Sequence, residues 1–201
     1  MADRQVAHGD KPALRGDARR NLEKLKAAAI EVFRERGLGA PLEAIAARAG
    51  VSVGTLYNRF GDRQALIDAV IPALAAAQLR RVVERASAGA SPWERFATFV
   101  ETICELQASD PILDDAVSAR FLEAEQLKAV CDEALAYAGQ LIEAAQRDGS
   151  LRPDFTAQDL FSVFLSSSAL ARASATAGGD AWWRHLAFIL DGLRTSSGRA
   201  R

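Results

Sequence analysis

The sequence predicts an all-α protein built from two helical domains. Apolar residues recur at three- and four-residue spacing in segment after segment, a pattern typical of amphipathic helices. No segment shows the strict alternation of a β-strand, and no internal repeat is present. We expect domains over residues 17–65 and 66–194, between a disordered arm, 1–16, and a disordered tail, 195–201.

The composition is that of a cytoplasmic globular protein. Of its 201 residues, 49% are hydrophobic and 25% are charged. No apolar run is long enough to cross a membrane, and the charged N-terminal segment lacks the apolar centre of a secretory signal. The two cysteines, Cys104 and Cys131, form no CxxC pair, so we expect reduced core residues rather than a disulfide.

Three short helices are predicted in the N-terminal domain. The first spans residues 17–36, and Gly37 ends it. The second and third span residues 42–49 and 53–60, with Gly50 between them. Their apolar faces can close a small common core.

A fourth, long helix over residues 63–85 is predicted to join the two domains. Asp62 can cap its first turn. Pro72 falls inside this helix and removes a backbone donor, so it acts either as a hinge or as a passive kink.

Further helices fill the C-terminal domain. Ser91-Pro92-Trp93-Glu94 is a capping box that opens one helix, and Asp110-Pro111 opens the next. Longer helices are predicted over residues 123–147, from Thr156 onward, and over 181–194.

The last of these helices, AWWRHLAFILDGLR, is apolar over most of its circumference. The core of one domain covers only one face of a helix, so the remaining apolar surface predicts a second copy of the chain as a partner. The residues expected at this dimer interface are Leu165, Leu170, Trp182, Trp183, Leu186, Ile189 and Leu190.

The stretch over residues 42–63 has the organisation of a helix-turn-helix unit. Ser52 can cap its second helix, in which Leu56 and Phe60 point toward the core. The outward side carries small polar groups and an aromatic hydroxyl, which suits a helix that lies in a DNA groove. Residues 1–65 also hold 12 Lys and Arg against 8 Asp and Glu, an excess that favours a polyanionic partner.

The order of these features resembles the N-terminal domain of TetR-type transcriptional regulators over residues 19–70. The segment AGVSVGTLYNRF, the following Asp62-Arg63 and Leu66 fall in register with that family. The resemblance implies a homodimer whose two recognition helices enter successive major grooves of a palindromic operator. The residues that it assigns to DNA binding are Ser52, Val53, Gly54, Thr55, Tyr57, Asn58, Arg59 and Arg63.

The sequence departs from that family at the start of the second helix. Ala40-Pro41 stands where a threonine often caps this helix and meets a phosphate, so that hydroxyl is missing. Arg59 replaces a common histidine and Arg63 a common lysine, which keeps or raises the positive charge.

By this resemblance, the expected function is a transcriptional repressor that a small apolar or aromatic effector releases from its operator. Aromatic residues of the C-terminal domain either line an effector pocket or belong to the core. The pocket candidates are Trp93, Phe96, Phe99, Phe121, Tyr137, Phe161 and Phe164. An activator of the same fold and a helical ligand-binding adaptor without DNA binding are the alternatives.

Residue types that form catalytic or metal sites are scarce. His8 and His185 are the only histidines, and no nucleophile motif, metal-ligand cluster or phosphate-binding loop is present in the sequence. Asp114 and Asp115 are interpreted as a solvated helix start rather than as an acid–base pair. We therefore expect no enzymatic activity, no metal and no cofactor.

Overall fold

The computed structural model describes residues 11–118, 123–175 and 181–195. Within these ranges it contains ten α-helices and no β-strand, apart from an isolated antiparallel bridge between Leu151 and Arg194. The predicted all-α fold is confirmed. None of the described helices is long and apolar enough to span a bilayer.

The helix-turn-helix unit forms where the sequence predicts it, from α2 (Leu42–Ala49) and α3 (Val53–Phe60). It follows α1 (Lys11–Arg36). Gly37 and Gly50 end the first two helices with φ angles of +77° and +70°. Glycine adopts this left-handed conformation without the steric cost that a Cβ atom brings.

The first helix begins at Lys11, earlier than predicted, so residues 11–16 of the expected disordered arm are helical. Pro12 suits a first helical turn, and the residues that follow it are mostly good helix formers. The helix therefore continues N-terminal to the residues that pack on the core, in a segment that has no apolar periodicity. The rest of the predicted arm and tail, residues 1–10 and 196–201, lies outside the described residues.

The predicted long helix is divided into α4 (Arg63–Val70) and α5 (Pro72–Ser87), and the break falls at Pro72, where the sequence predicts a hinge or a kink. Pro72 has no N–H to donate to the preceding turn. Ile71 keeps helical backbone angles, with φ −91° and ψ −37°, and its N–H donates to the Ile67 carbonyl at 2.8 Å. The chain consequently passes from one helix to the other without a loop.

The C-terminal domain consists of α6 (Pro92–Ser109), α7 (Pro111–Val117), α8 (Glu125–Arg147), α9 (Ala157–Ala175) and α10 (Ala181–Leu193). Side-chain caps explain two of the starts. The Ser91 hydroxyl accepts from the Glu94 N–H at 3.2 Å, and the Asp110 carboxylate accepts from the Ile112 N–H at 2.9 Å.

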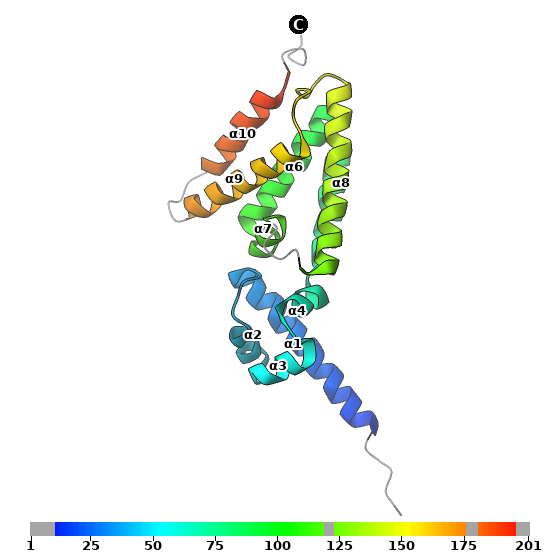
Figure 1. Cartoon of the computed structure of the whole chain (residues 1–201), viewed down its shortest axis with the longest axis vertical. Coiled ribbons are helices and arrows are strands. Elements are labelled where there is room, and N and C mark those ends of the chain that lie inside the picture. The colour runs from blue at the N-terminus through cyan, green and yellow to red at the C-terminus, as the bar shows by residue number, and fades with distance from the viewer. Residues whose placement is uncertain (1–10, 119–122, 176–180, 196–201) are drawn as a thin grey trace, which may run out of the picture.

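Buried side chains form two apolar cores. The first combines Phe33 of α1 and Leu56 of α3 with Ile112 of α7 and Leu127 of α8. The second is built from α5, α6, α8, α9 and α10. In Figure 1, α1 to α4 gather at one end of the molecule, and α7 and the start of α8 lie next to them. Helices on both sides of the boundary predicted near residue 65 therefore pack against each other.

Two adjacent carboxylates lie in this junction. Asp114 and Asp115 of α7 are each 8% exposed, so their interpretation as a solvated helix start is wrong. Asp115 Oδ2 accepts from the Leu38 N–H at 2.7 Å, and Asp114 accepts from the Ser168 hydroxyl and pairs with Arg172. These partners are more than 50 residues away in sequence, and local spacing cannot reveal them.

A second polar link joins the domains between α4 and α8. The residue before α8, Ala124, offers no side-chain cap. Asp68 of α4 supplies one instead, because its Oδ1 accepts from the N–H groups of Gln126 and Leu127, both at 3.2 Å. The start of α8 is thereby fixed to the helix that follows the recognition helix.

Candidate nucleic-acid interface and effector cavity

The recognition helix α3 presents one face to the core and the opposite face to solvent. Leu56 is fully buried, whereas Gly54, Thr55, Asn58 and Arg59 are exposed, and Tyr57 is 47% exposed. None of these exposed side chains carries a negative charge, so the face is compatible with phosphates and base edges.

Ser52 fixes the first turn of this helix. Its Oγ accepts from the Thr55 N–H at 3.1 Å and lies 2.9 Å from Thr55 Oγ1. The predicted cap is confirmed. The hydroxyl of Thr55 is therefore oriented by the cap before any ligand arrives.

A surface hollow of about 320 Å³ separates α1 from α3. Thr55, Asn58 and Arg59 border it on one side, and Asn21 and Leu22 of α1 border it on the other. Asn21 was not among the predicted DNA-binding residues. It follows the arginine pair of α1 in sequence, but no pattern there distinguishes it from an ordinary solvent-exposed asparagine.

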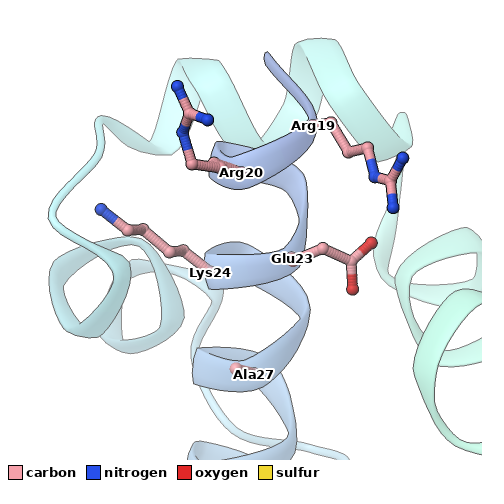
Figure 2. A pocket seen from close by; sticks show the side chains of 5 residues that line it. All are labelled: Arg19, Arg20, Glu23, Lys24 and Ala27. Carbon is pink, nitrogen blue, oxygen red and sulfur yellow. The ribbon is translucent and has the colours of Figure 1, made fainter. Parts of the chain in front are cut away.

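The N-terminal part of α1 adds positive charge beside this face. Arg19, Arg20 and Lys24 line a second, larger hollow of about 560 Å³ together with Glu23 and Ala27. In Figure 2, Arg20 and Lys24 extend to one side of α1, while Arg19 and Glu23 extend to the other. Two cationic side chains, Arg20 and Lys24, thus extend to the same side of α1.

Arg63 lies differently from the other predicted DNA-binding residues. It is partly buried, and its Nη1 donates to the carbonyls of Leu38 and Ala40 at 2.9 and 2.6 Å. In the protein without DNA, this guanidinium thus secures the turn between α1 and α2. Pro41, at the start of α2, makes no side-chain cap, as the sequence predicted.

The C-terminal domain contains an apolar cavity of about 120 Å³ among α6, α7, α8 and α9. Of the predicted pocket residues, Phe99, Phe161 and Phe164 line it. Sequence reasoning missed most of the wall, which is formed by smaller side chains. These are Ile103, Ala116, Val117, Cys131, Asp132, Ala134, Leu135 and Ala138.

The other aromatic candidates serve different purposes. Trp93 and Phe96 belong to the second core, where their ring centroids lie 5.8 Å apart. Tyr137 packs on Phe99 at 5.6 Å and its hydroxyl lies 3.2 Å from Ser87 Oγ. Phe121 lies outside the described residues.

The cavity wall is almost free of charge. Its one carboxylate, Asp132, pairs with Lys128 at 2.5 Å. Burial raises the pKa of the Cys131 thiol above its usual range, and burial raises the pKa of nearby Cys104 to about 12. Both thiols are free and neutral at physiological pH, so Asp132 is the one charged group among the described residues of the wall.

Two of the residues predicted for the dimer interface belong to the core of the protomer instead. Leu186 and Leu190 of α10 are buried in the second core, which leaves them unavailable to a partner. Leu165 and Trp183 are exposed, whereas Leu170, Trp182 and Ile189 are half-buried. The most exposed large apolar side chain in this region is Phe188, at 67%, which the prediction omitted.

Comparison with known proteins identifies the class to which this architecture belongs. Residues 25–70 match the family model of the bacterial regulatory proteins of the tetR family. Residues 91–195, more than half of the chain, match the C-terminal domain of SbtR-like transcriptional regulators. The chain belongs to the TetR family of transcriptional regulators.

Several solved structures are similar to this chain. A TetR transcriptional regulator from Streptomyces coelicolor is 32% identical, over 87% of this chain and 98% of its own, with a TM-score of 0.47. FadR from Bacillus subtilis in complex with stearoyl-CoA is 16% identical over 85% of this chain and 96% of its own, with a TM-score of 0.59. RolR in complex with resorcinol is 18% identical over 91% of this chain and 92% of its own, with a TM-score of 0.60.

At these lower identities, FadR and RolR show the fold alone. No curated protein sequence matches the chain. TetR-family regulators are generally non-enzymatic proteins that bind DNA, dimerise and bind small-molecule ligands. Among the described residues, no group of three or more His, Cys, Asp or Glu side chains could hold a metal ion.

Proposed function

We propose that this protein is a homodimeric repressor that a small apolar or aromatic effector releases from a palindromic operator. The observation that carries the proposal is the exposed, carboxylate-free face of α3 within a family-matched helix-turn-helix unit. Whether the bound protein represses or activates depends on the position of the operator, so an activator of the same fold is the alternative.

The chemistry of α3 supports contacts with DNA. Gly54 allows close approach of the backbone, and Thr55 offers a hydroxyl and a methyl group to base edges. Asn58 and Arg59 can bind phosphates, and Tyr57 can donate its hydroxyl. In a two-fold symmetric dimer, the half-site centres lie about 34 Å apart or a small multiple of that distance.

The cavity supports a small uncharged effector. Its volume of about 120 Å³ and apolar wall suit a single substituted aromatic ring better than a charged metabolite. RolR, which shares the fold, is solved with resorcinol, and FadR is solved with stearoyl-CoA. The effector must bind the form released from DNA more tightly, by a few kcal/mol for a clear switch.

A thermal-shift screen of small neutral aromatics, with resorcinol included, tests the effector class. A ligand present at 100 times its Kd stabilises the folded protein by about 2.7 kcal/mol, which raises the melting temperature measurably. A screen in which charged metabolites stabilise the protein and neutral aromatics do not would contradict the assignment.

Fluorescence anisotropy with an operator fragment selected from random DNA tests the recognition helix. The double variant Tyr57→Phe, Arg59→Ala should bind at least about tenfold more weakly, because it loses a hydroxyl and a phosphate contact. Arg147→Ala is the matched control, since Arg147 is an exposed arginine that ends α8, far from α3 (Figure 1).

Unchanged affinity in the double variant would show that α3 does not read this DNA. The competing possibility of an adaptor without DNA binding predicts no selected fragment and no steep loss of retention on DNA as salt rises.

A further inference from the structure

The turn between α1 and α2 is clamped from both sides. On one side Arg63 donates to the carbonyls of Leu38 and Ala40. On the other side Asp115 of α7 accepts from the Leu38 N–H at 2.7 Å, in a buried position. The Asp115 carboxylate lies so close to Gly37 that a Cβ atom at that residue would collide with it.

This turn sets the direction of the recognition helix relative to α1. Leu38 and Ala40 are buried in the first core, and α2 begins at Leu42, immediately after the turn. Because α3 packs on α2 through a tight turn at Gly50, any shift of the α1–α2 turn displaces both helices together. Without Asp115, the buried Leu38 N–H would have no acceptor, and this would destabilise the turn in its native position.

The helix that carries Asp115 also forms part of the effector cavity. Ala116 and Val117 follow Asp115 in α7, and both line the cavity. A ligand that pushes this wall outward must move a helix of only seven residues, one of which holds the turn. A hollow of about 350 Å³, bordered by Gly37, Pro111 and Asp115, lies beside the junction and leaves space for that movement.

A second connection fixes α7 to α9. Asp114 accepts from the Ser168 hydroxyl and pairs with Arg172. Helix α9 also contributes Phe161 and Phe164 to the cavity wall. Asp114 therefore connects α7 to α9, and both helices contribute side chains to the cavity wall.

We propose that Asp115 is a positioning residue that holds the α1–α2 turn in its DNA-binding position, and that filling the cavity displaces α7 and loosens this hold. The inference rests on the proposed function, because it takes the cavity as the effector site. In this proposal, α7 and Leu38 transmit the effector signal, in addition to α4, the helix that follows the recognition helix.

Cavity-filling substitutions replace the unidentified effector in the test. Ala138 of α8 is buried in the cavity wall, so Ala138→Leu occupies part of the space a ligand would take. Ala134→Leu, at a half-buried wall position, is the second variant if Ala138→Leu does not fold. Operator affinity is measured by anisotropy on the full chain.

We expect Ala138→Leu and Asp115→Ala each to weaken operator binding by about tenfold, since each lowers the population of the binding-competent form. The double variant should bind within about twofold of Asp115→Ala alone, because both changes act through one contact. Asp115→Asn keeps an acceptor oxygen and should restore near-normal affinity and sensitivity to the cavity substitution. Additive losses, about 100-fold in the double variant, or no effect of the cavity-filling substitutions, would overturn the inference.

Amide hydrogen exchange at Leu38 provides a readout that needs no DNA. Asp115→Ala and Ala138→Leu should each speed this exchange by at least about tenfold, whereas Asp115→Asn should not. Asp154→Ala is the control, because it removes an exposed carboxylate that pairs only locally with Arg152. Unchanged exchange in Asp115→Ala overturns the inference while leaving the repressor proposal intact, whereas a wild-type protein that selects no DNA refutes the repressor proposal whatever the exchange at Leu38.

Discussion

At the scale of single residues, Ser52 links local stability to recognition. Its hydroxyl accepts from the Thr55 N–H and lies beside the Thr55 hydroxyl, so it fixes the turn from which α3 starts. It is also exposed on the face proposed to meet DNA. A serine can perform both tasks because the cap uses one lone pair of Oγ and leaves the rest of the hydroxyl accessible.

Two substitutions of Ser52 separate these tasks. Ser52→Ala removes the cap and should lower the free energy of unfolding by about 1 kcal/mol. Ser52→Asp keeps a capping acceptor, so its stability should stay within about 0.5 kcal/mol of wild type, while its added negative charge should weaken operator binding by at least about tenfold. Urea unfolding and anisotropy measure the two quantities. Wild-type affinity in Ser52→Asp would remove Ser52 from the DNA interface.

Arg63 shows why residue roles are harder to predict than helices. Its charge and its place in the motif favour a phosphate contact, yet its guanidinium binds two carbonyls of the α1–α2 turn. Asp115 likewise binds a backbone group of this turn from a distance of 77 residues. Neither partner is a neighbour in sequence, so no spacing rule relates them.

At the scale of elements, α9 and α10 expose an apolar face that includes Leu165, Trp183 and Phe188. Arg184 lies over the Phe188 ring, 6.0 Å from its centroid, and partly shields it from solvent. Leu186 and Leu190 lie on the side of α10 opposite to Phe188 and are buried in the second core. Helical periodicity separates these two sides of α10, but it does not tell which side faces the protomer's own core.

A charged substitution on this face tests its proposed role in dimerisation. Phe188→Glu should convert the dimer to a monomer in light-scattering measurements, because a buried carboxylate without a partner costs several kcal/mol at an interface. Ala136→Glu is the control, because Ala136 is an exposed residue of α8 that does not line the cavity. A Phe188→Glu protein that remains dimeric would place the interface elsewhere.

At the scale of the whole molecule, the features that the sequence could predict are those that interactions between neighbouring residues determine. Apolar periodicity, caps at Ser52, Ser91 and Asp110, and left-handed glycines define most helices near their observed bounds. The errors concern contacts between elements or the detailed effect of one residue. Pro72 divides the predicted helix, and Asp114 and Asp115 are buried at the junction between the domains rather than solvated.

The two candidate sites also differ in how much of each the sequence could predict. The exposed face of α3 was predictable because it depends on eight consecutive residues of one helix, whereas its contact with DNA stays a prediction. The cavity was only partly predictable, since aromatic residues at helical spacing lie as readily in a core as in a pocket. Small residues such as Ala116 and Ala138 create the empty space, and nothing in their local sequence marks them as cavity wall.

Selection of bound fragments from random DNA by the full-length protein tests the central claim most directly. A dimer with paired recognition helices predicts enriched fragments with two-fold symmetry and half-site centres about 34 Å apart, or a small multiple of that spacing. Enrichment of asymmetric sites, or no enrichment over the starting pool, would contradict a dimeric operator-binding regulator.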